Sequence, residues 1–303
     1  MTTIAPDSNA GHWRSSRLIG VAHVAVADLV RAEIVHYYLA ADAPCSPSVC
    51  QEDYMTETQV VKARDAAEWD LRCEMAATFR LSARWQWNEG IGNHNSAMIP
   101  GTEYYLINPR GLIFDEIRAS DLLVCDLEGN VISGKGELRK VALHIHARIH
   151  LMHPQARIVL HVHPRYTTAL SIIEGGRLEM AHSNDALFLD RVAYDDEMNG
   201  AVLDNSEGDR IARCLGGKTT LIMGSHGVTT VGTTVADALC ELAAVERSAM
   251  WQMTAKAAGG TLKRLPDQLR RRHLGPLHEV WDSELEFAAY RRILDREEPS
   301  YAT

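Results

Sequence analysis

The sequence predicts an α/β or α+β fold in which helices cover a sheet. Apolar runs typical of buried strands are mixed with long amphipathic segments, without a regular strand–helix–strand rhythm and without an internal repeat. The chain of 303 residues is long for one domain and short for two, and 46% of it is hydrophobic, which is ample for a large core. One compact core with additional segments is therefore expected.

The N-terminal part is predicted to be an extension of that core. Residues 1–17 are polar and are expected to be disordered, whereas residues 18–54 contain one amphipathic helical stretch, "VADLVRAEIVHYYLAA". A long helix is predicted from Thr58 to Trp85, because apolar residues recur there at spacings of three and four. We therefore place the extension at residues 1–57.

The middle of the chain is predicted to hold most of the strands. In "WNEGIGNHNSAMIPGTEYYLINPRG", glycines, asparagines and prolines surround short apolar runs, and "DLLVCDLEGNVISG" is typical of a hairpin. "ELRKVALHIHARIHLMHP" has helical spacing and stops at Pro154. "ARIVLHVHP" is a predicted strand, and "TTLIMGSHGVTTVG" is predicted to be another strand that ends in a glycine-bounded turn.

The C-terminal part is predicted to be helical. Residues from Val235 to Ala258 have strong helical spacing, and more helix is expected after "AGGTL" as far as Asp295. The predicted organisation is therefore a core domain over residues 58–258, followed by a helical tail over residues 259–303.

Composition limits the classes of partner. The formal net charge is −9, which argues against a surface for nucleic acid, because phosphate binding relies on clustered Lys and Arg. No run approaches the ~18 apolar residues that a membrane helix needs, and the first residues lack an apolar secretory core. The six cysteines never form CxxC, which indicates neither a zinc knuckle nor a disulfide framework. We expect a cytoplasmic protein.

Two histidines end the strand predicted in "ARIVLHVHP". Residues two apart in a strand point to the same face, so His161 and His163 can chelate one divalent metal, although hydrogen-bonded polar residues at a strand end are an alternative. His226 follows a second apolar strand, beside glycines that permit close backbone approach. Three neutral imidazoles with an open position suit a catalytic Zn²⁺ or Fe²⁺. Spacing alone does not bring His226 to the pair.

The chain resembles the class II aldolase/adducin family over roughly residues 65–258. The matching segments occur in the family's order: "EGIGNHNSAMIPG", "YYLINPRGLIFDEIRASDLLVCDLEGNVISG", "HIHARIHLMHPQARIVLHVHP", "RVAYDDEMNGAV", "LIMGSHGVTTVGTTVADAL" and "AAVERSAMWQ". The resemblance implies a three-layer α/β/α sandwich with a mostly antiparallel central sheet. It makes His161, His163 and His226 the metal ligands, and it implies a homotetramer whose active site lies near a protomer boundary.

The chain departs from the sugar-phosphate aldolases of that family at the acid/base position. In those enzymes an "SSE" segment precedes the metal histidines, and its glutamate corresponds here to Ala142. The phosphate-binding serines correspond to Lys140 and Val141, and a "TG" pair corresponds to Arg110 and Gly111. The resemblance is therefore to a branch that lacks the catalytic glutamate and does not hold a sugar phosphate in the usual way.

Cations in place of those serines indicate a small anionic organic substrate. Arg110 is suited to bidentate carboxylate binding, and Lys140 adds a second candidate charge, although a solvent-facing helix residue is an equal alternative for Lys140. Asn184, in "HSND", lies in a segment that could line the pocket. We predict that all three residues contribute to substrate binding.

Without the glutamate, proton transfer must come from other groups. The candidates are His94, which takes the place of a phosphate-binding asparagine in the aldolases, His146 on the helix expected to face the metal strand, and Tyr166 after the "HVHP" turn. An imidazole titrates near neutrality and can act as acid or base. For each of the three, a hydrogen-bonded packing role is the alternative.

The predicted function is that of a metal-dependent carbon–carbon lyase. A divalent ion, Zn²⁺ first and Fe²⁺ or Mn²⁺ as alternatives, would stabilise the enolate formed by retro-aldol cleavage or decarboxylation of an anionic hydroxy- or oxo-acid. A non-heme Fe(II) oxygenase acting on an aryl keto acid is a second hypothesis. The third is a non-catalytic, adducin-like scaffold, against which the histidine trio weighs.

Overall fold

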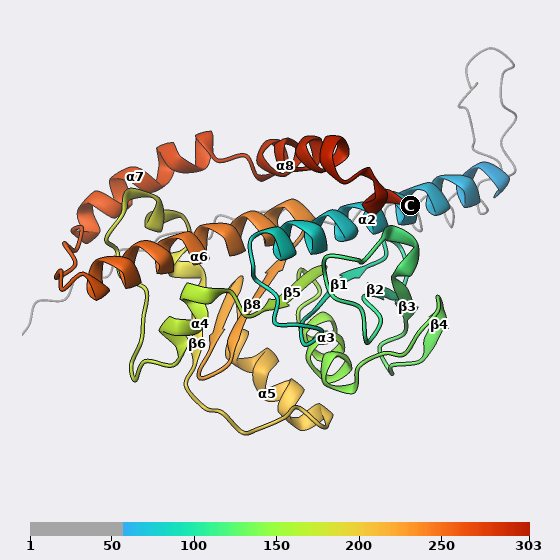
Figure 1. Cartoon of the computed structure of the whole chain (residues 1–303), viewed down its shortest axis with the longest axis horizontal. Coiled ribbons are helices and arrows are strands. Elements are labelled where there is room, and N and C mark those ends of the chain that lie inside the picture. The colour runs from blue at the N-terminus through green and yellow to red at the C-terminus, as the bar shows by residue number, and fades with distance from the viewer. Residues whose placement is uncertain (1–56) are drawn as a thin grey trace, which may run out of the picture. The chain divides into compact units, whose positions relative to one another are not determined.

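The computed structural model describes residues 57–303, so the predicted extension over residues 1–57 lies almost wholly outside the described residues. Within the described part, eight strands form one sheet in the order β4-β3-β2-β1-β5-β8-β7-β6 (Figure 1). Every neighbouring pair is antiparallel except β6 and β7, which confirms the mostly antiparallel sheet. The strands are β1 (His94–Met98), β2 (Tyr105–Ile107), β3 (Leu123–Cys125), β4 (Val131–Ser133), β5 (Ile158–Val162), β6 (Val192–Asp195), β7 (Thr220–Met223) and β8 (Gly227–Gly232).

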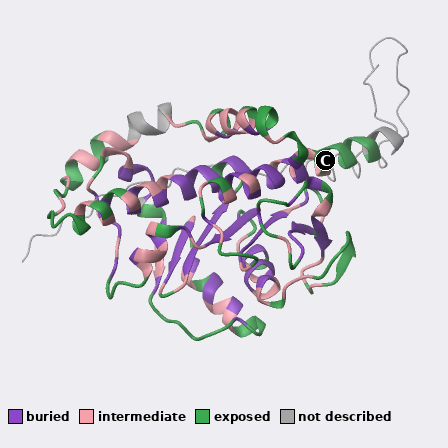
Figure 2. Ribbon diagram, viewed as in Figure 1, coloured by how far each residue is buried: buried purple, intermediate pink, exposed green. Residues whose placement is uncertain are grey.

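Helices cover both faces of the sheet, which confirms the three-layer α/β/α sandwich (Figure 1). On one face α3 and α5 share an apolar cluster with the strands, and on the other face α2, α4 and α6 do so. Buried residues are concentrated in the strands and on the facing sides of the helices (Figure 2). The helices are α2 (Glu57–Arg84), α3 (Lys140–Met152), α4 (Arg165–Ser171), α5 (Asn205–Leu215), α6 (Val235–Ala257), α7 (Asp267–Val280) and α8 (Ser283–Glu297).

Strand β5 lies in the middle of the sheet, between β1 and β8. All five of its residues are buried, and it pairs with β1 on one side and β8 on the other. Helix α3 ends at Met152, just before Pro154, and a short turn leads into β5. Because α3 packs back against β5, the helix begins beside the C-terminal end of β5. The candidate site lies at this end of the strand.

One predicted strand is two strands in the structure. "TTLIMGSHGVTTVG" was expected to be a single strand that ends in a turn, whereas the chain reverses at Ser225 and returns as β8. Ser225 has φ of +53°, in the left-handed region, which allows the tight reversal between β7 and β8. Strand β6 and helix α5 were not predicted from the sequence. The signals for α5 were present, since Asp204 caps its first turn and Gly216 follows its end with a positive φ.

The C-terminal segment is helical, as expected. Helix α8 contributes Phe287 and Leu294 to the same apolar cluster as α6, so it packs on the core domain. Domain boundaries at residues 57/58 and 258/259 stay a prediction. Among residues 57–303, each helix is too short or too polar to cross a membrane.

The buried carboxylate of Glu246 supports the helix that follows the histidine strand. It accepts hydrogen bonds from the backbone N–H of Tyr166 at 2.9 Å and from the N–H and hydroxyl of Thr167, both at 2.7 Å. These groups lie in the first turn of α4, where N–H groups have no partner within the helix. We infer that Glu246 on α6 holds α4 in place.

Replacement of Glu246 with Gln is therefore expected to destabilise the protein by ~2 kcal/mol, because the amide NH₂ cannot accept the hydrogen bonds that one carboxylate oxygen accepts. Urea unfolding followed by circular dichroism measures this loss. The exposed turn residue Glu128, changed to Gln, is the control and should shift stability by less than ~0.5 kcal/mol. Equal effects of the two substitutions would contradict the role given to Glu246.

Candidate active site

Three histidines converge at the C-terminal end of the inner strand β5. His161 lies in β5, His163 follows that strand, and His226 lies in the turn between β7 and β8. One ring nitrogen from each lies within 4.8 Å of the other two. The ring centroids are 5.2 Å apart for His161 and His163, 4.8 Å for His161 and His226, and 4.9 Å for His163 and His226. The fold thus brings His226 to the pair, which sequence spacing did not establish.

The glycine after His226 is required by this convergence. A Cβ on Gly227 would lie 2.4 Å from Cδ2 of His163 and 2.7 Å from the carbonyl oxygen of Val162. Such distances are much shorter than ordinary van der Waals contact, so only glycine lets the turn approach β5 this closely. The "His-Gly" pair seen in the sequence is therefore a packing requirement of the histidine cluster.

Each member of the β5 pair is fixed by a hydrogen bond through Nδ1. Nδ1 of His163 donates to Oε2 of Glu89 at 2.6 Å, and Nδ1 of His161 lies 3.1 Å from the hydroxyl of Thr229. Nε2 of His163 is buried and has no hydrogen-bond partner among the described residues. A carboxylate that orients a histidine through the nitrogen opposite the ligand atom is a common arrangement in metal sites.

The electrostatics of the cluster favour neutral imidazoles at His161 and His226. Burial lowers the pKa of His226 to about 4 and holds the pKa of His161 well below its ordinary value. The hydrogen bond from His163 lowers the pKa of Glu89, so this carboxylate is ionised near neutrality. Neutral nitrogen donors, a buried Nε2 without a partner and an ionised supporting carboxylate fit a divalent cation.

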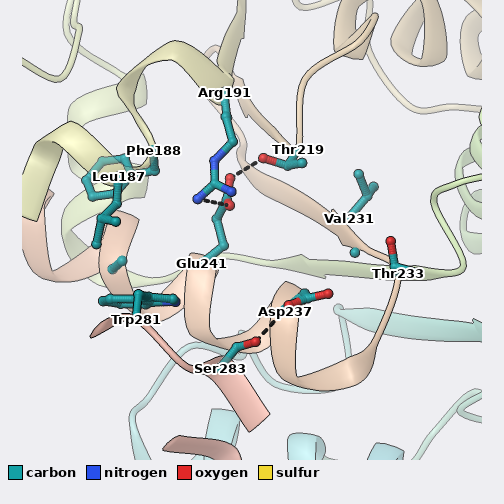
Figure 3. A pocket seen from close by; sticks show the side chains of 12 residues that line it. Leu187, Phe188, Arg191, Thr219, Val231, Thr233, Asp237, Glu241, Trp281 and Ser283 are labelled. Atoms are coloured by element: carbon teal, nitrogen blue, oxygen red, sulfur yellow. Dashed lines mark hydrogen bonds and ion pairs between the residues drawn. The ribbon is translucent and has the colours of Figure 1, made fainter. Parts of the chain in front are cut away.

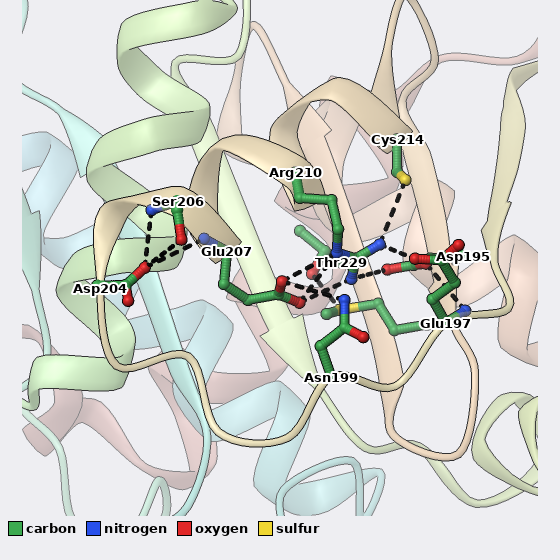
Figure 4. A network of polar contacts seen from close by, with 10 residues as sticks. Asp195, Glu197, Asn199, Asp204, Ser206, Glu207, Arg210, Cys214 and Thr229 are labelled. Atoms are coloured by element: carbon green, nitrogen blue, oxygen red, sulfur yellow. Dashed lines mark hydrogen bonds and ion pairs between the residues drawn. The ribbon is translucent and has the colours of Figure 1, made fainter.

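A polar network supports the turn that carries His226 (Figure 4). Arg210 of α5 donates to both carboxylate oxygens of Asp195, at 2.8 and 2.6 Å, and also pairs with Glu207. These two carboxylates raise the pKa of Arg210, so the guanidinium stays charged. The backbone of Asp195 in turn accepts the N–H of Gly224 at 2.6 Å. The network therefore ties the β7–β8 turn to β6 and α5.

Two predicted proton-transfer residues lie directly beside the cluster. His94 is the cross-strand partner of His161, and their rings stack at 5.0 Å between centroids with an interplanar angle of 25°. Nε2 of His146 lies 2.8 Å from Nδ1 of His94, and both side chains are buried. Burial, followed by the nearby charge of Arg139, lowers the pKa of His94 to about 3.

For the third predicted proton-transfer residue, Tyr166, the contacts seen are with the apolar core and not with the histidine cluster. Tyr166 is the second residue of α4, and its half-buried ring packs against the main apolar cluster. Its backbone N–H binds Glu246, as described above. A packing role is established for Tyr166 by these contacts, and its catalytic role stays a prediction.

The predicted substrate-binding residues fall in two places. Arg110 is largely exposed and its guanidinium lies 3.7 Å from the carboxylate of Glu137, while Lys140 is exposed at the first residue of α3. Both therefore lie near the N-terminus of α3, on the side of the sheet where β5 ends in the histidines. Asn184 makes its hydrogen bonds within its own segment, to His182 and Ser183. The roles of all three stay predictions.

Sequence reasoning missed three residues beside the cluster. Glu89 reaches His163 across 74 positions of sequence, and Arg139 donates to the carbonyl oxygens of Ile91 and Gly92, both at 3.1 Å, close to His94. Ser96 lies two residues after His94 on β1, where the period of a strand places both on one face. That period was the only sequence signal available for any of the three.

A separate cavity of about 290 Å³ lies away from the histidines (Figure 3). It is lined in part by Arg191, Glu241, Trp281 and Gly232, and the Arg191–Glu241 ion pair of 2.8 Å lies within it. Strand β8 starts beside His163 and ends at Gly232, so this cavity is at the opposite end of that strand. Arg191 and Glu241 are paired with each other, and Asp237 accepts a hydrogen bond from the Ser283 hydroxyl at 2.7 Å, so we assign no ligand to the cavity.

The sequence profile of the Class II Aldolase and Adducin N-terminal domain matches residues 73–253. The chain belongs to the class II aldolase and adducin family. A Pseudomonas aeruginosa relative, named for class 2 aldolases rather than for a measured reaction, is 33% identical over 78% of this chain and 93% of its own length. Alpha-adducin of Rattus norvegicus is 30% identical over 70% of this chain, but the match spans only 30% of the adducin.

Solved structures of this family have the same fold. An aldolase II superfamily protein from Pseudomonas syringae superposes with a TM-score of 0.73 at 32% identity, over 80% of this chain and 100% of its own. An L-fuculose 1-phosphate aldolase from Glaciozyma antarctica superposes with a TM-score of 0.69 at 23% identity, over 82% of this chain and 96% of its own. At that identity the second likeness shows the fold alone. Family membership therefore supports a role that is either lyase-type or adducin-like.

The buried histidines predict that the metal-free protein loses stability in mild acid. Burial lowers the pKa of His150 to about 4, from an ordinary value of 6.5. Below pH 6.5 the unfolded chain gains a proton on His150 that the folded protein does not, so stability falls as the pH falls towards 4. Between pH 7.5 and 5.0 this single group accounts for ~2 kcal/mol.

Urea unfolding of the metal-free protein at the two pH values tests this prediction. His150→Gln should reduce the pH dependence by about this amount, because one of the groups that titrate differently in the two states is gone, while His94, His161 and His226 still contribute. His144→Gln, on the same helix but outside the buried set, is the matched control and should keep the wild-type slope. Identical slopes for wild type and His150→Gln would refute the assignment.

Proposed function

We propose that this family member is a metal-dependent carbon–carbon lyase that acts on a small anionic hydroxy- or oxo-acid. The observation that carries the proposal is the histidine cluster, with three ring nitrogens within 4.8 Å and a buried, unpartnered Nε2 on His163. His161, His163 and His226 would hold the ion, with Zn²⁺ as the first choice and Fe²⁺ or Mn²⁺ as alternatives. When bound, such an ion supplies Lewis-acid stabilisation of negative charge that develops on the substrate.

The chain's own residues would carry binding and proton transfer. Arg110 and Lys140 offer positive charge to a substrate carboxylate at the edge where α3 begins, and both are exposed enough to reach one. His94 and His146 are the imidazoles nearest the cluster and are proposed to hold and move the proton. Tyr166 and Asn184 are retained as secondary candidates for catalysis and for substrate contact.

A sugar phosphate bound in the usual family manner is not part of the proposal. Ala142, at the position that the resemblance assigns to the catalytic glutamate, is buried and packs against Tyr105, Ile107 and Leu123. Glu137 is exposed and faces Arg110, so it is an ion-pair partner and not a substitute acid. The proton chemistry must therefore differ from that of the sugar-phosphate aldolases.

The second candidate function is an adducin-like scaffold without catalysis, which is favoured by the similarity to alpha-adducin. A scaffold needs the layers of the fold but has no use for a set of neutral imidazoles around one point. For the enzyme we propose a cytoplasmic homotetramer with the site near a protomer boundary. The family membership supports oligomerisation in general, and size-exclusion chromatography with light scattering measures the state.

Metal content and turnover test the main proposal together. Protein purified without added metal should contain about one zinc or manganese ion per chain, and His161→Ala should lose both the ion and any cleavage of hydroxy- and oxo-acids. Elemental analysis and a product assay over a substrate panel measure the two. Iron with oxygen uptake on aryl keto acids would replace the lyase with the oxygenase, and the absence of bound metal would favour the scaffold.

The carboxylate beside His163 should tune metal affinity without being a ligand. Glu89→Gln keeps the shape but removes the ionised acceptor for Nδ1 of His163, so the dissociation constant for Zn²⁺ should rise ~10- to 100-fold. Competition with a chromogenic chelator measures this constant. Glu103→Gln, an exposed change in the loop before β2, is the control and should leave it unaltered. Unchanged affinity in Glu89→Gln would remove Glu89 from the site.

A further inference from the structure

We infer that Ser96 and His150 are positioning residues that hold His94 as its Nδ1–H tautomer, which leaves a free lone pair on Nε2 of His94 beside the histidine cluster. The tautomer follows from the hydrogen-bond geometry of buried, neutral rings. Only the use of that lone pair, as an acceptor for a substrate hydroxyl, rests on the proposed function.

Four buried side chains form one continuous hydrogen-bonded chain. His94 and Ser96 are two apart on β1, and His146 and His150 are four apart on α3, so each pair lies on one face of its element. The two faces meet and the side chains alternate. The order is His94 Nδ1 to His146 Nε2 at 2.8 Å, His146 Nδ1 to the Ser96 hydroxyl, and the Ser96 hydroxyl to His150 Nε2 at 2.7 Å.

The backbone fixes the direction of the chain at its far end. Nδ1 of His150 lies 2.7 Å from the carbonyl oxygen of Ala156. A carbonyl oxygen only accepts, so Nδ1 of His150 carries a proton. In the neutral ring Nε2 is then unprotonated, and it accepts the hydroxyl proton of Ser96. The oxygen of Ser96 is left to accept from Nδ1–H of His146.

The directions of the remaining hydrogen bonds, as far as the histidine cluster, are fixed in the same way. With its proton on Nδ1, neutral His146 has an unprotonated Nε2 and accepts from Nδ1–H of His94. Nε2 of His94 therefore keeps its lone pair, and no described residue makes a hydrogen bond to it. Since the ring of His94 stacks on that of His161, this lone pair is beside the cluster.

The opposite direction requires a charged group in the core. If Ser96 accepted from Nε2–H of His150, then His150 would carry protons on both nitrogens, because Nδ1–H is held by Ala156. The side chain of His150 is buried, and burial lowers its pKa to about 4, so the imidazolium form is disfavoured near neutral pH. The hydrogen-bonded chain also ends at the carbonyl oxygen of Ala156, which takes no proton. It therefore fixes a tautomer and does not conduct protons to solvent.

The tautomer selects the kind of group that the site recognises. A lone pair on Nε2 of His94 accepts a hydrogen bond, so it favours a hydroxyl or a water molecule as its partner. An N–H at the same position would favour a carbonyl or a carboxylate oxygen instead. Under the proposed function, His94 therefore binds the hydroxyl of a hydroxy-acid, while Ser96 and His150 act only through it.

Neutron diffraction from crystals of the metal-free, deuterium-exchanged protein at neutral pH tests the direction. The expected result is deuterium on Nδ1 of His94, His146 and His150, with none on Nε2 of His94. Deuterium on Nε2 of His94, or on both nitrogens of His150, would overturn the inference. The measurement needs neither substrate nor metal, so failure of the lyase proposal and failure of this inference are separate results.

A matched pair of variants tests the role of Ser96. Ser96→Thr keeps the hydroxyl, whereas Ser96→Val has nearly the same shape as Thr without it, and both β-branched side chains suit β1. Ser96→Thr should keep deuterium on Nδ1 of His94. In Ser96→Val, His146 loses the acceptor for Nδ1–H, so its proton should move to Nε2 and the deuterium of His94 should move from Nδ1 to Nε2.

Unchanged deuterium positions in Ser96→Val would show that Ser96 does not set the tautomer. His150→Leu is the second variant if Ser96→Val does not fold: it removes the acceptor for the Ser96 hydroxyl, which is then free to donate to Nδ1 of His146. It should also shift the deuterium of His94 to Nε2. His144 also lies on α3 but is hydrogen-bonded to Asn205 and not to the four residues of the hydrogen-bonded chain. His144→Gln should therefore leave the deuterium of His94 as in the wild type.

Discussion

The register of the β1–β5–β8 ladder is the constraint on which the site depends. It places His94, His161 and Thr229 in one row across three strands, on the same face of the sheet. A slip of one residue in either pairing would turn one of these side chains to the other face. The register is held because β5 is buried along its whole length and each of its neighbours must keep its apolar side chains in the same layers.

That row explains why a cluster of imidazoles can exist inside the protein. Each buried histidine has a specific partner for Nδ1: the hydroxyl of Thr229 for His161, Ser96 for His146, and the carbonyl of Ala156 for His150. A buried polar group without a partner costs ~1–3 kcal/mol, so these contacts are needed for the set to be tolerated. Nε2 of His163 is buried without a hydrogen-bond partner among the described residues, and a free ring nitrogen within a histidine cluster suits a cation.

The sequence predicted the helices and strands better than the tertiary contacts between them. The period of two in a strand placed His161 and His163 on one face, and helical spacing located α3 and α6 within a few residues. It did not reveal the β7–β8 hairpin, because the turn "GSHG", with Ser225 in the left-handed region, resembles a strand end. Glu89 could not be found, since no local pattern records a contact over 74 positions. From the sequence, His226 could be joined to the pair only through the family resemblance.

The replacement of the family's glutamate by Ala142 and the buried histidine chain together bear on whether the protein is an enzyme. Ala142 is ordinary core, and it shows that this position on α3 has no carboxylate to offer. One and two turns further along, the same helix buries His146 and His150, where apolar side chains would cost less to bury. A scaffold gains nothing from that arrangement. The hydrogen-bonded chain from His150 to His94 does one thing that an apolar core cannot do: it fixes which nitrogen of His94 is free beside the histidine cluster. This supports the enzyme proposal over the scaffold.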